Sequence, residues 1–187
     1  MSDDATLGHA LLARARNAIA DRLGLPLTDE PPHPALHAPG ATFVTLTESG
    51  RLRGCIGTLE AHRSLEADVR ANAVAAAFRD PRFAPVEIDE WPHIQLEVSL
   101  LMTPVPLPCR DEADALARLR PGIDGVIFEY GGYRSTFLPQ VWDQLPEPAT
   151  FLNQLKRKAG LPDTFWAPEV QLSRYEVRKW KENRRSI

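Results

Sequence analysis

Proline is the residue that most constrains how this chain folds. The sequence contains 17 prolines in 187 residues, about 9% against a usual ~5%. Because proline lacks a backbone donor and breaks helices from within, we expect many short elements joined by rigid turns. Hydrophobic residues make up 43% of the chain and charged residues 25%. This composition is that of a folded globular protein and excludes wholesale disorder, collagen and coiled coils.

Charge and cysteine content exclude several further classes of protein. The formal net charge is −3, so general binding of nucleic acid is not expected. No apolar run approaches the ~18 residues that cross a bilayer, and the acidic N-terminus lacks the order of a secretory signal. Cys55 and Cys109 are too few for a disulfide scaffold. We therefore expect a soluble cytoplasmic protein that associates with neither nucleic acid nor membrane.

The periodicity of the apolar residues predicts an α+β protein, a mixed α/β fold. A largely antiparallel or mixed sheet with flanking helices is expected, because hairpins and helices alternate without regular βαβ repeats. Helices are predicted over residues 6–23, 64–79, 111–120, 140–145 and 151–159, and strands over 42–47, 51–58, 93–101, 126–130, 133–138 and 170–180.

These elements are expected to form one domain, residues 1–187, with two lobes. A proline-rich connector at about 26–39 precedes the first hairpin, 42–58, and a second hairpin spans 126–138. His33 and His37 lie in the connector, but the prolines around them prevent the helix that would place both on one face. A zinc site needs three or four ligands, so no metal site is predicted.

Several sequence blocks occur together in an order typical of one protein family. The most specific block reads Leu52-Arg53-Gly54-Cys55-Ile56-Gly57-Thr58, and we call it the hallmark strand. With it, the chain resembles the AMMECR domain family, known also as protein A of the AmmeMemoRadiSam system, over roughly residues 39–180. The other matching blocks are Phe43–Leu46, Asp80–Phe83, Glu97–Leu100, Thr136–Trp142 and Lys158–Leu161.

The resemblance implies a two-lobed structure with the hallmark strand near the groove between the lobes. It also implies partnership with a Memo-like protein and a radical-SAM enzyme. The family has no settled reaction, so neither a substrate nor a cofactor follows from it. Family members often carry cysteine where this chain has Lys156, which argues against any chemistry that needs a second thiol at that position.

The hallmark strand carries most of the candidate site residues. Side chains alternate along a strand, so Arg53, Cys55 and Gly57 are expected on one face. A neighbouring cation stabilises a thiolate, which is a nucleophile or a soft metal ligand. Gly54 and Gly57 would let the backbone approach a ligand closely. Glu97 would serve as a proton carrier, and Arg53 with Arg134 would hold a small anionic ligand.

Each of these residues also has a purely structural interpretation. Cysteine is often a buried, small apolar side chain, and glycines in strands mark bulges or close packing. Glu97 would then be solvated on the polar face of its strand. At Asp80–Phe83 the favoured interpretation is a structural corner, in which Asp80 accepts hydrogen bonds from free backbone amides.

Three functions follow from these alternatives. The leading hypothesis is a ligand-binding or accessory component of an AmmeMemoRadiSam-type system. The second is an enzyme with Cys55 as nucleophile and Glu97 as proton carrier. The third is a pure protein-interaction module.

Overall fold

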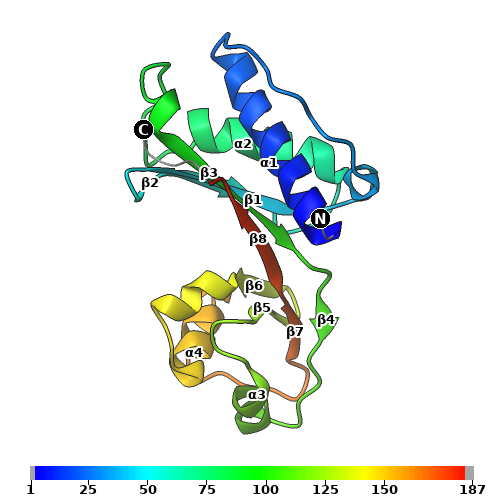
Figure 1. Cartoon of the computed structure of the whole chain (residues 1–187). Helices are drawn as coiled ribbons and strands as arrows, with labels where there is room; N and C mark the ends of the chain where they lie inside the picture. The colour runs from blue at the N-terminus through cyan, green and yellow to red at the C-terminus, as the bar shows by residue number, and fades with distance from the viewer. Residues whose placement is uncertain (1–2, 184–187) are drawn as a thin grey trace. The chain divides into compact units, whose positions relative to one another are not determined.

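The computed structural model describes residues 3–183 and divides into two units (Figure 1). Unit 1 comprises Met1–Leu101 and Arg178–Ile187, and unit 2 comprises Met102–Val177. Each unit has its own four-stranded antiparallel sheet and its own hydrophobic core. The α+β fold class predicted from the sequence is therefore confirmed.

In unit 1 the strand order is β2-β1-β3-β8. The helices α1 (Asp3–Arg22) and α2 (Leu65–Phe78) cover one face of this sheet (Figure 1). The α2 helix begins as the sequence predicts, because the Ser64 hydroxyl accepts a hydrogen bond from the Ala67 amide at 3.3 Å. The four strands are β1 (Thr42–Glu48), β2 (Arg51–Gly57), β3 (Ile94–Leu101) and β8 (Val177–Lys181).

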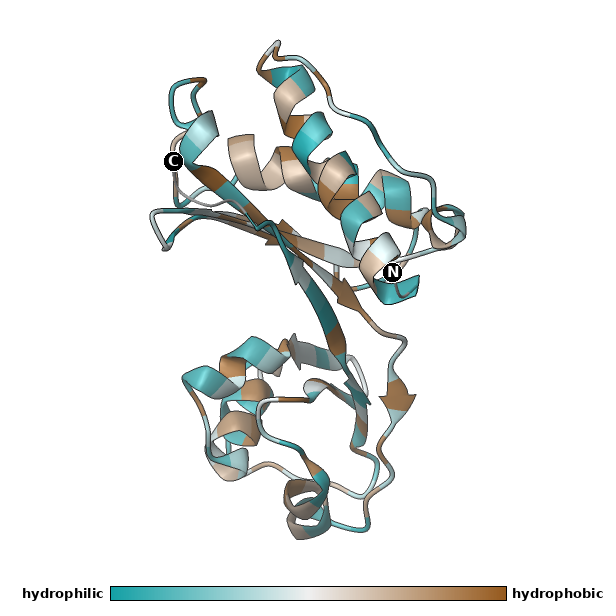
Figure 2. Ribbon diagram, in the orientation of Figure 1, coloured by the Kyte–Doolittle hydropathy of each residue, from teal (hydrophilic) through white to brown (hydrophobic). Residues whose placement is uncertain are grey.

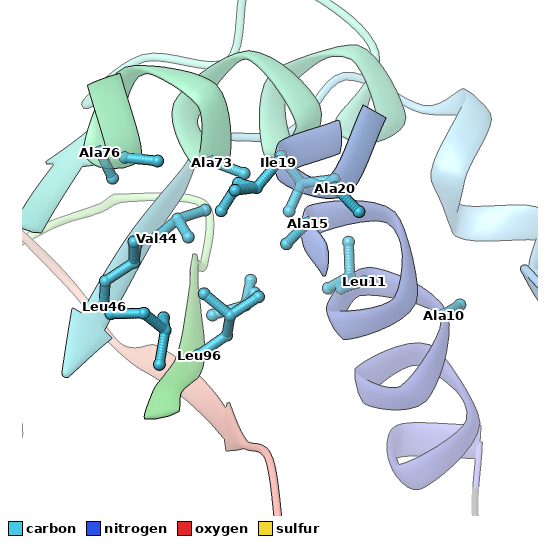
Figure 3. Close-up of a cluster of buried hydrophobic side chains, with 14 of the residues drawn as sticks. Ala10, Leu11, Ala15, Ile19, Ala20, Val44, Leu46, Ala73, Ala76 and Leu96 are labelled. Atoms are coloured by element: carbon cyan, nitrogen blue, oxygen red, sulfur yellow. The ribbon is translucent and has the colours of Figure 1, made fainter. Parts of the chain in front are cut away.

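Alternation along these strands separates the core of unit 1 from the opposite face. Val44 and Leu46 of β1 and Leu96 of β3 are fully buried and lie against α1 and α2 (Figure 3). The residues between them point to the face that carries neither helix of unit 1. We call this the helix-free face; the register of β1 with β2 and β3 assigns to it Phe43, Thr45, Cys55, Gly57, Glu97 and Ser99.

In unit 2 the strand order is β4-β7-β5-β6. Its core includes Trp142, whose ring stacks on Phe151 with centroids 3.7 Å apart. The elements are β4 (Val105–Pro106), α3 (Glu112–Arg118), β5 (Gly125–Tyr130), β6 (Tyr133–Phe137), α4 (Pro148–Ala159) and β7 (Gln171–Tyr175), with a short 3-10 helix at Pro139–Asp143.

Two sequence predictions about these elements are wrong. Residues 170–180 do not form one strand: β7 and β8 are separated at Glu176 and belong to different sheets. The sequence offers Thr150 as the cap of a helix over residues 151–159, but α4 starts earlier, with Glu147 at its N-cap position and Pro148 in its first turn. Proline is well placed there because its missing N–H would be unpaired in any case.

Candidate functional site

Three side chains on the helix-free face line up across neighbouring strands. Thr45 of β1 lies opposite Cys55 of β2 and also opposite Glu97 of β3. The Cys55 Sγ is 3.3 Å from the Thr45 Oγ1. All three residues are half-buried. We call them the Cys55 row; since neighbouring strands lie about 4.8 Å apart, the backbones of Cys55 and Glu97 are roughly 10 Å from each other.

The carboxylate of Glu97 is the unpaired group of this row. Within residues 3–183 it takes part in no ion pair or side-chain hydrogen bond. A half-buried carboxylate without a partner is available to a ligand that presents a hydrogen-bond donor or a positive charge. The row thus offers a thiol, a hydroxyl and a carboxylate along one line.

Arg53 is engaged away from the thiol. Its guanidinium pairs with Glu90 through two contacts, Nε to Oε1 at 2.8 Å and Nη2 to Oε2 at 3.0 Å. This hydrogen bond raises the pKa of Arg53 and lowers the pKa of Glu90. The Arg53 Nη1 also donates to the Ala84 carbonyl at 2.9 Å. Arg53 therefore ties the hallmark strand to the segment that joins α2 to β3.

A β-bulge explains why simple alternation misplaces Arg53. Leu46 lies opposite Gly54, whereas Thr47 lies opposite Leu52, so Arg53 has no partner residue on β1. A bulge inserts one extra residue into a strand and redirects its side chain. The expected sharing of one face by Arg53 and Cys55 relied on an unbroken alternation.

Asp80 and Arg82 bind the backbone of Cys55, and we call this pair the edge clamp. The Cys55 amide donates to the Asp80 Oδ2 at 2.9 Å, and the Arg82 Nη2 donates to the Cys55 carbonyl at 3.2 Å. The two clamp side chains pair with each other at 2.7 Å. Because β2 is an edge strand, the clamp occupies the groups that an added strand would bind. Asp80 thus acts as the corner interpretation expected.

The edge clamp predicts an acid-dependent contribution to stability. Hydrogen bonds from Arg82, and from backbone amides, hold the pKa of Asp80 far below its usual range. This stabilisation is present above the unfolded-state pKa near ~3.9 and is lost as the pH falls toward the folded value. We expect Asp80→Asn to lower the Tm at pH 7, and the difference from wild type to shrink between about pH 5 and pH 2.

Thermal unfolding across this pH range measures the effect. Asp89→Asn is the matched control, because Asp89 is exposed and has no ion pair within the described residues; its Tm should follow wild type at every pH. A difference for Asp80→Asn that stays constant from pH 7 to pH 2 would contradict the assignment.

Both glycines of the hallmark strand are required by packing inside unit 1. A Cβ on Gly54 would lie 2.2 Å from the Ala76 carbonyl oxygen of α2. A Cβ on Gly57 would lie 2.2 Å from the Phe43 ring. The two glycines thus allow close packing within the protein: α2 packs on Gly54 from one face of the sheet, and the Phe43 ring packs on Gly57 from the other face.

Arg134 lies in unit 2, whereas the Cys55 row lies in unit 1. Its Nε donates to the Glu129 Oε1 at 3.0 Å, and the two residues are cross-strand partners on β5 and β6. The Cys55 row is formed without it. In the same unit, burial raises the pKa of the half-buried Cys109, and Lys156 is fully buried with its Nζ 2.6 Å from Glu112.

The site contains functional candidates that the sequence did not single out. Thr45 contacts Cys55 because the register of the first hairpin places the two residues opposite each other. The predicted turn was the one sequence feature that could have indicated this register. Arg82 lies beside Cys55 although 27 positions separate them in the sequence. Within residues 3–183, no group of three or more His, Cys, Asp or Glu side chains is arranged to hold a metal ion, and no helix is long and apolar enough to cross a membrane.

Comparison with known proteins gives consistent matches over nearly the whole chain. A sequence model of the AMMECR1 family matches residues 12–180. A protein of Methanothermobacter thermautotrophicus is 39% identical over 186 residues, which covers 94% of each chain. A protein of Sulfolobus acidocaldarius is 37% identical and covers 94% of this chain and 82% of its own. The crystal structure of the uncharacterized protein PH0010 from Pyrococcus horikoshii superimposes with a TM-score of 0.77 at 31% identity, covering 94% of this chain and 91% of that one.

Proposed function

Because the chain belongs to the AMMECR1 family, we propose that it is a ligand-binding accessory component of an AmmeMemoRadiSam-type system. Its partners would be a Memo-like protein and a radical-SAM enzyme. The observation that carries the proposal is the Cys55 row, in which a thiol, a hydroxyl and an unpaired carboxylate share one face of a sheet. Three different polar groups in line provide the few placed contacts that orient a small ligand.

The ion pairs of the neighbouring arginines indicate which kind of ligand the Cys55 row would bind. Arg53 is neutralised by Glu90, and Arg82 by Asp80. The anionic ligand expected from Arg53 and Arg134 stays a prediction, since both arginines carry carboxylate partners. The unpaired Glu97 supports a ligand that donates a hydrogen bond at one end and lies over Thr45, with the Cys55 thiol at the other end.

The test is a pair of variants that change the row without changing its shape. Cys55→Ser and Glu97→Gln are expected to keep the wild-type Tm within a few degrees, because both side chains are half-buried. Each should abolish the cellular function of the protein in its native host. Glu87→Gln is the control, because Glu87 is exposed and lies outside the Cys55 row. The substitution removes the same charge as Glu97→Gln does. A folded Cys55→Ala protein that retains every cellular function would overturn the proposal.

The hydrogen bond between Cys55 and Thr45 also favours an enzymatic alternative. The Thr45 hydroxyl, at 3.3 Å, would stabilise a Cys55 thiolate acting as nucleophile. Thr45 lies between Cys55 and Glu97 in the row, so its hydroxyl, or the ligand, would pass the proton from the thiol to the Glu97 carboxylate. In this case Cys55 should react with iodoacetamide at pH 7 at least about tenfold faster than Cys109, whose thiol pKa is raised by burial. Equal rates would exclude an activated nucleophile.

A further inference from the structure

The strand β8 forms the second edge of the unit 1 sheet. Within residues 3–183, β3 is the only strand that pairs with it. The opposite edge of the sheet, β2, is occupied by the edge clamp at Cys55. At β8, by contrast, one row of backbone N–H and C=O groups faces away from the sheet and can pair with an additional strand.

The side chains of β8 divide cleanly between the two faces of the sheet. Arg178 pairs with Asp4 of α1, and the Trp180 ring lies against Gly8 of α1. Alternation then directs Lys179 and Lys181 to the helix-free face. Both lysines are exposed, and within the described part of the chain neither has an ion pair or hydrogen bond of its side chain. Figure 2 shows the resulting hydrophilic character of β8.

A groove of about 1090 Å³ lies beside β8 and α1 in unit 1. Two charged residues of its lining, Arg16 and Glu182, are paired with each other, and Glu30 is paired with Arg70. The rest of the lining is mixed: it includes the apolar Leu12, Pro31 and Trp180 and the polar His9, Thr28 and Asp29, and the strand residues Lys179 and Lys181 border the groove at the β8 edge.

We propose that the free edge of β8 docks an extended segment of a partner protein in which acidic and apolar side chains alternate. The segment would add a fifth strand through backbone hydrogen bonds, as in other cases of strand addition. Its acidic side chains would face Lys179 and Lys181. Its apolar side chains, which point to the other face, would enter the groove beside Trp180. This docking surface does not include the Cys55 row, so the inference does not rest on the proposed function.

The charge of β8 selects among the possible occupants. Lysines on an edge strand discourage pairing with apolar or basic strands. A second copy of β8 would bring Lys179 and Lys181 close to the same residues, and like charges across a strand pair are destabilising. An acidic segment would instead be attracted to the two lysines, and apolar residues at its alternate positions would pack against Trp180 and Leu12 in the groove.

The test uses two labelled seven-residue peptides, one alternating glutamate with valine and one alternating lysine with valine. When the full chain is added, the fluorescence polarisation of the labelled Glu-Val peptide should rise. The polarisation of the Lys-Val peptide should not change. The double variant Lys179→Ala/Lys181→Ala should weaken its affinity about fivefold or more, as expected for two exposed ion pairs. Ala5→Trp, which fills the groove from an exposed position, should weaken it as well.

A second double variant controls for total charge. Arg22→Ala/Arg51→Ala removes two exposed positive charges of unit 1 and should leave the affinity unchanged. The inference is overturned if neither peptide binds, if both bind equally, or if the lysine variant binds as wild type does. It is also overturned if wild type forms a dimer in sedimentation that the lysine variant strengthens, because the edge would then pair with a second copy.

Discussion

A Gly54→Ala variant is expected to unfold at a clearly lower denaturant concentration than wild type, with a loss of about 3 kcal/mol in the free energy of unfolding. The added Cβ would lie 2.2 Å from the Ala76 carbonyl oxygen. That oxygen belongs to the backbone of α2, so it cannot move aside without displacing the helix. Equilibrium denaturation followed by circular dichroism measures the loss.

Two other glycines provide graded controls for this variant. The neighbour of a Gly57 Cβ is the Phe43 ring, a side chain that can rotate, so Gly57→Ala should lose less stability. Gly132→Ala should change the free energy of unfolding by less than about 0.5 kcal/mol, because no atom lies within 4 Å of its added Cβ. A Gly57→Ala or Gly132→Ala protein less stable than Gly54→Ala would contradict the close packing of α2 on β2.

Turns and helix ends that depend on a few neighbouring residues were predicted well from the sequence. The turn at Glu48-Ser49-Gly50 predicted the first hairpin, and Ser64 predicted the start of α2. Gly160 ends α4 in the left-handed conformation, with φ 93°. In each case neighbouring residues determine the local backbone, so no knowledge of distant contacts is needed.

The candidate site was predicted only in part, because its contacts join distant segments. Cys55 and Glu97 were singled out, and the structure places them in one row through Thr45. The bulge at Arg53 depends on how β2 fits β1 and has no sequence signature of its own. The edge clamp joins Asp80 and Arg82 to Cys55. These residues are far apart in the sequence, so the periodicity of apolar residues could not predict the contact.

Asp68 shows how a residue with a sufficient local explanation can have a different role. In the sequence it lies in the first turns of a helix, where the dipole favours a negative charge. In the structure its side chain is fully buried. It accepts hydrogen bonds from the Thr42 amide at 2.8 Å, the Thr42 hydroxyl at 2.7 Å, the Thr58 hydroxyl at 2.8 Å and the Arg63 Nε at 2.8 Å. Asp68 thus joins α2 to both strands of the first hairpin.

The second large effect is expected for Asp68→Ala, with a loss of about 3–5 kcal/mol in the free energy of unfolding. The substitution leaves the amide and the hydroxyl donor of the fully buried Thr42 without their acceptor. A chemical denaturation curve measures it, with Asp21→Ala as the control at an exposed helical position.

The size of the loss separates the two explanations of Asp68. If only the helix dipole were involved, Asp68→Ala would cost at most about 1 kcal/mol, and added salt would remove much of that difference. A buried hydrogen-bonded carboxylate is screened much less, so the loss should persist at high salt. An Arg63→Ala variant should lose less stability than Asp68→Ala, because the Arg63 side chain is one-third exposed and Asp68 keeps its hydrogen bonds from Thr42, Thr58 and Asn72. A loss below about 1 kcal/mol that vanishes in salt would overturn the conclusion that Asp68 joins α2 to the first hairpin.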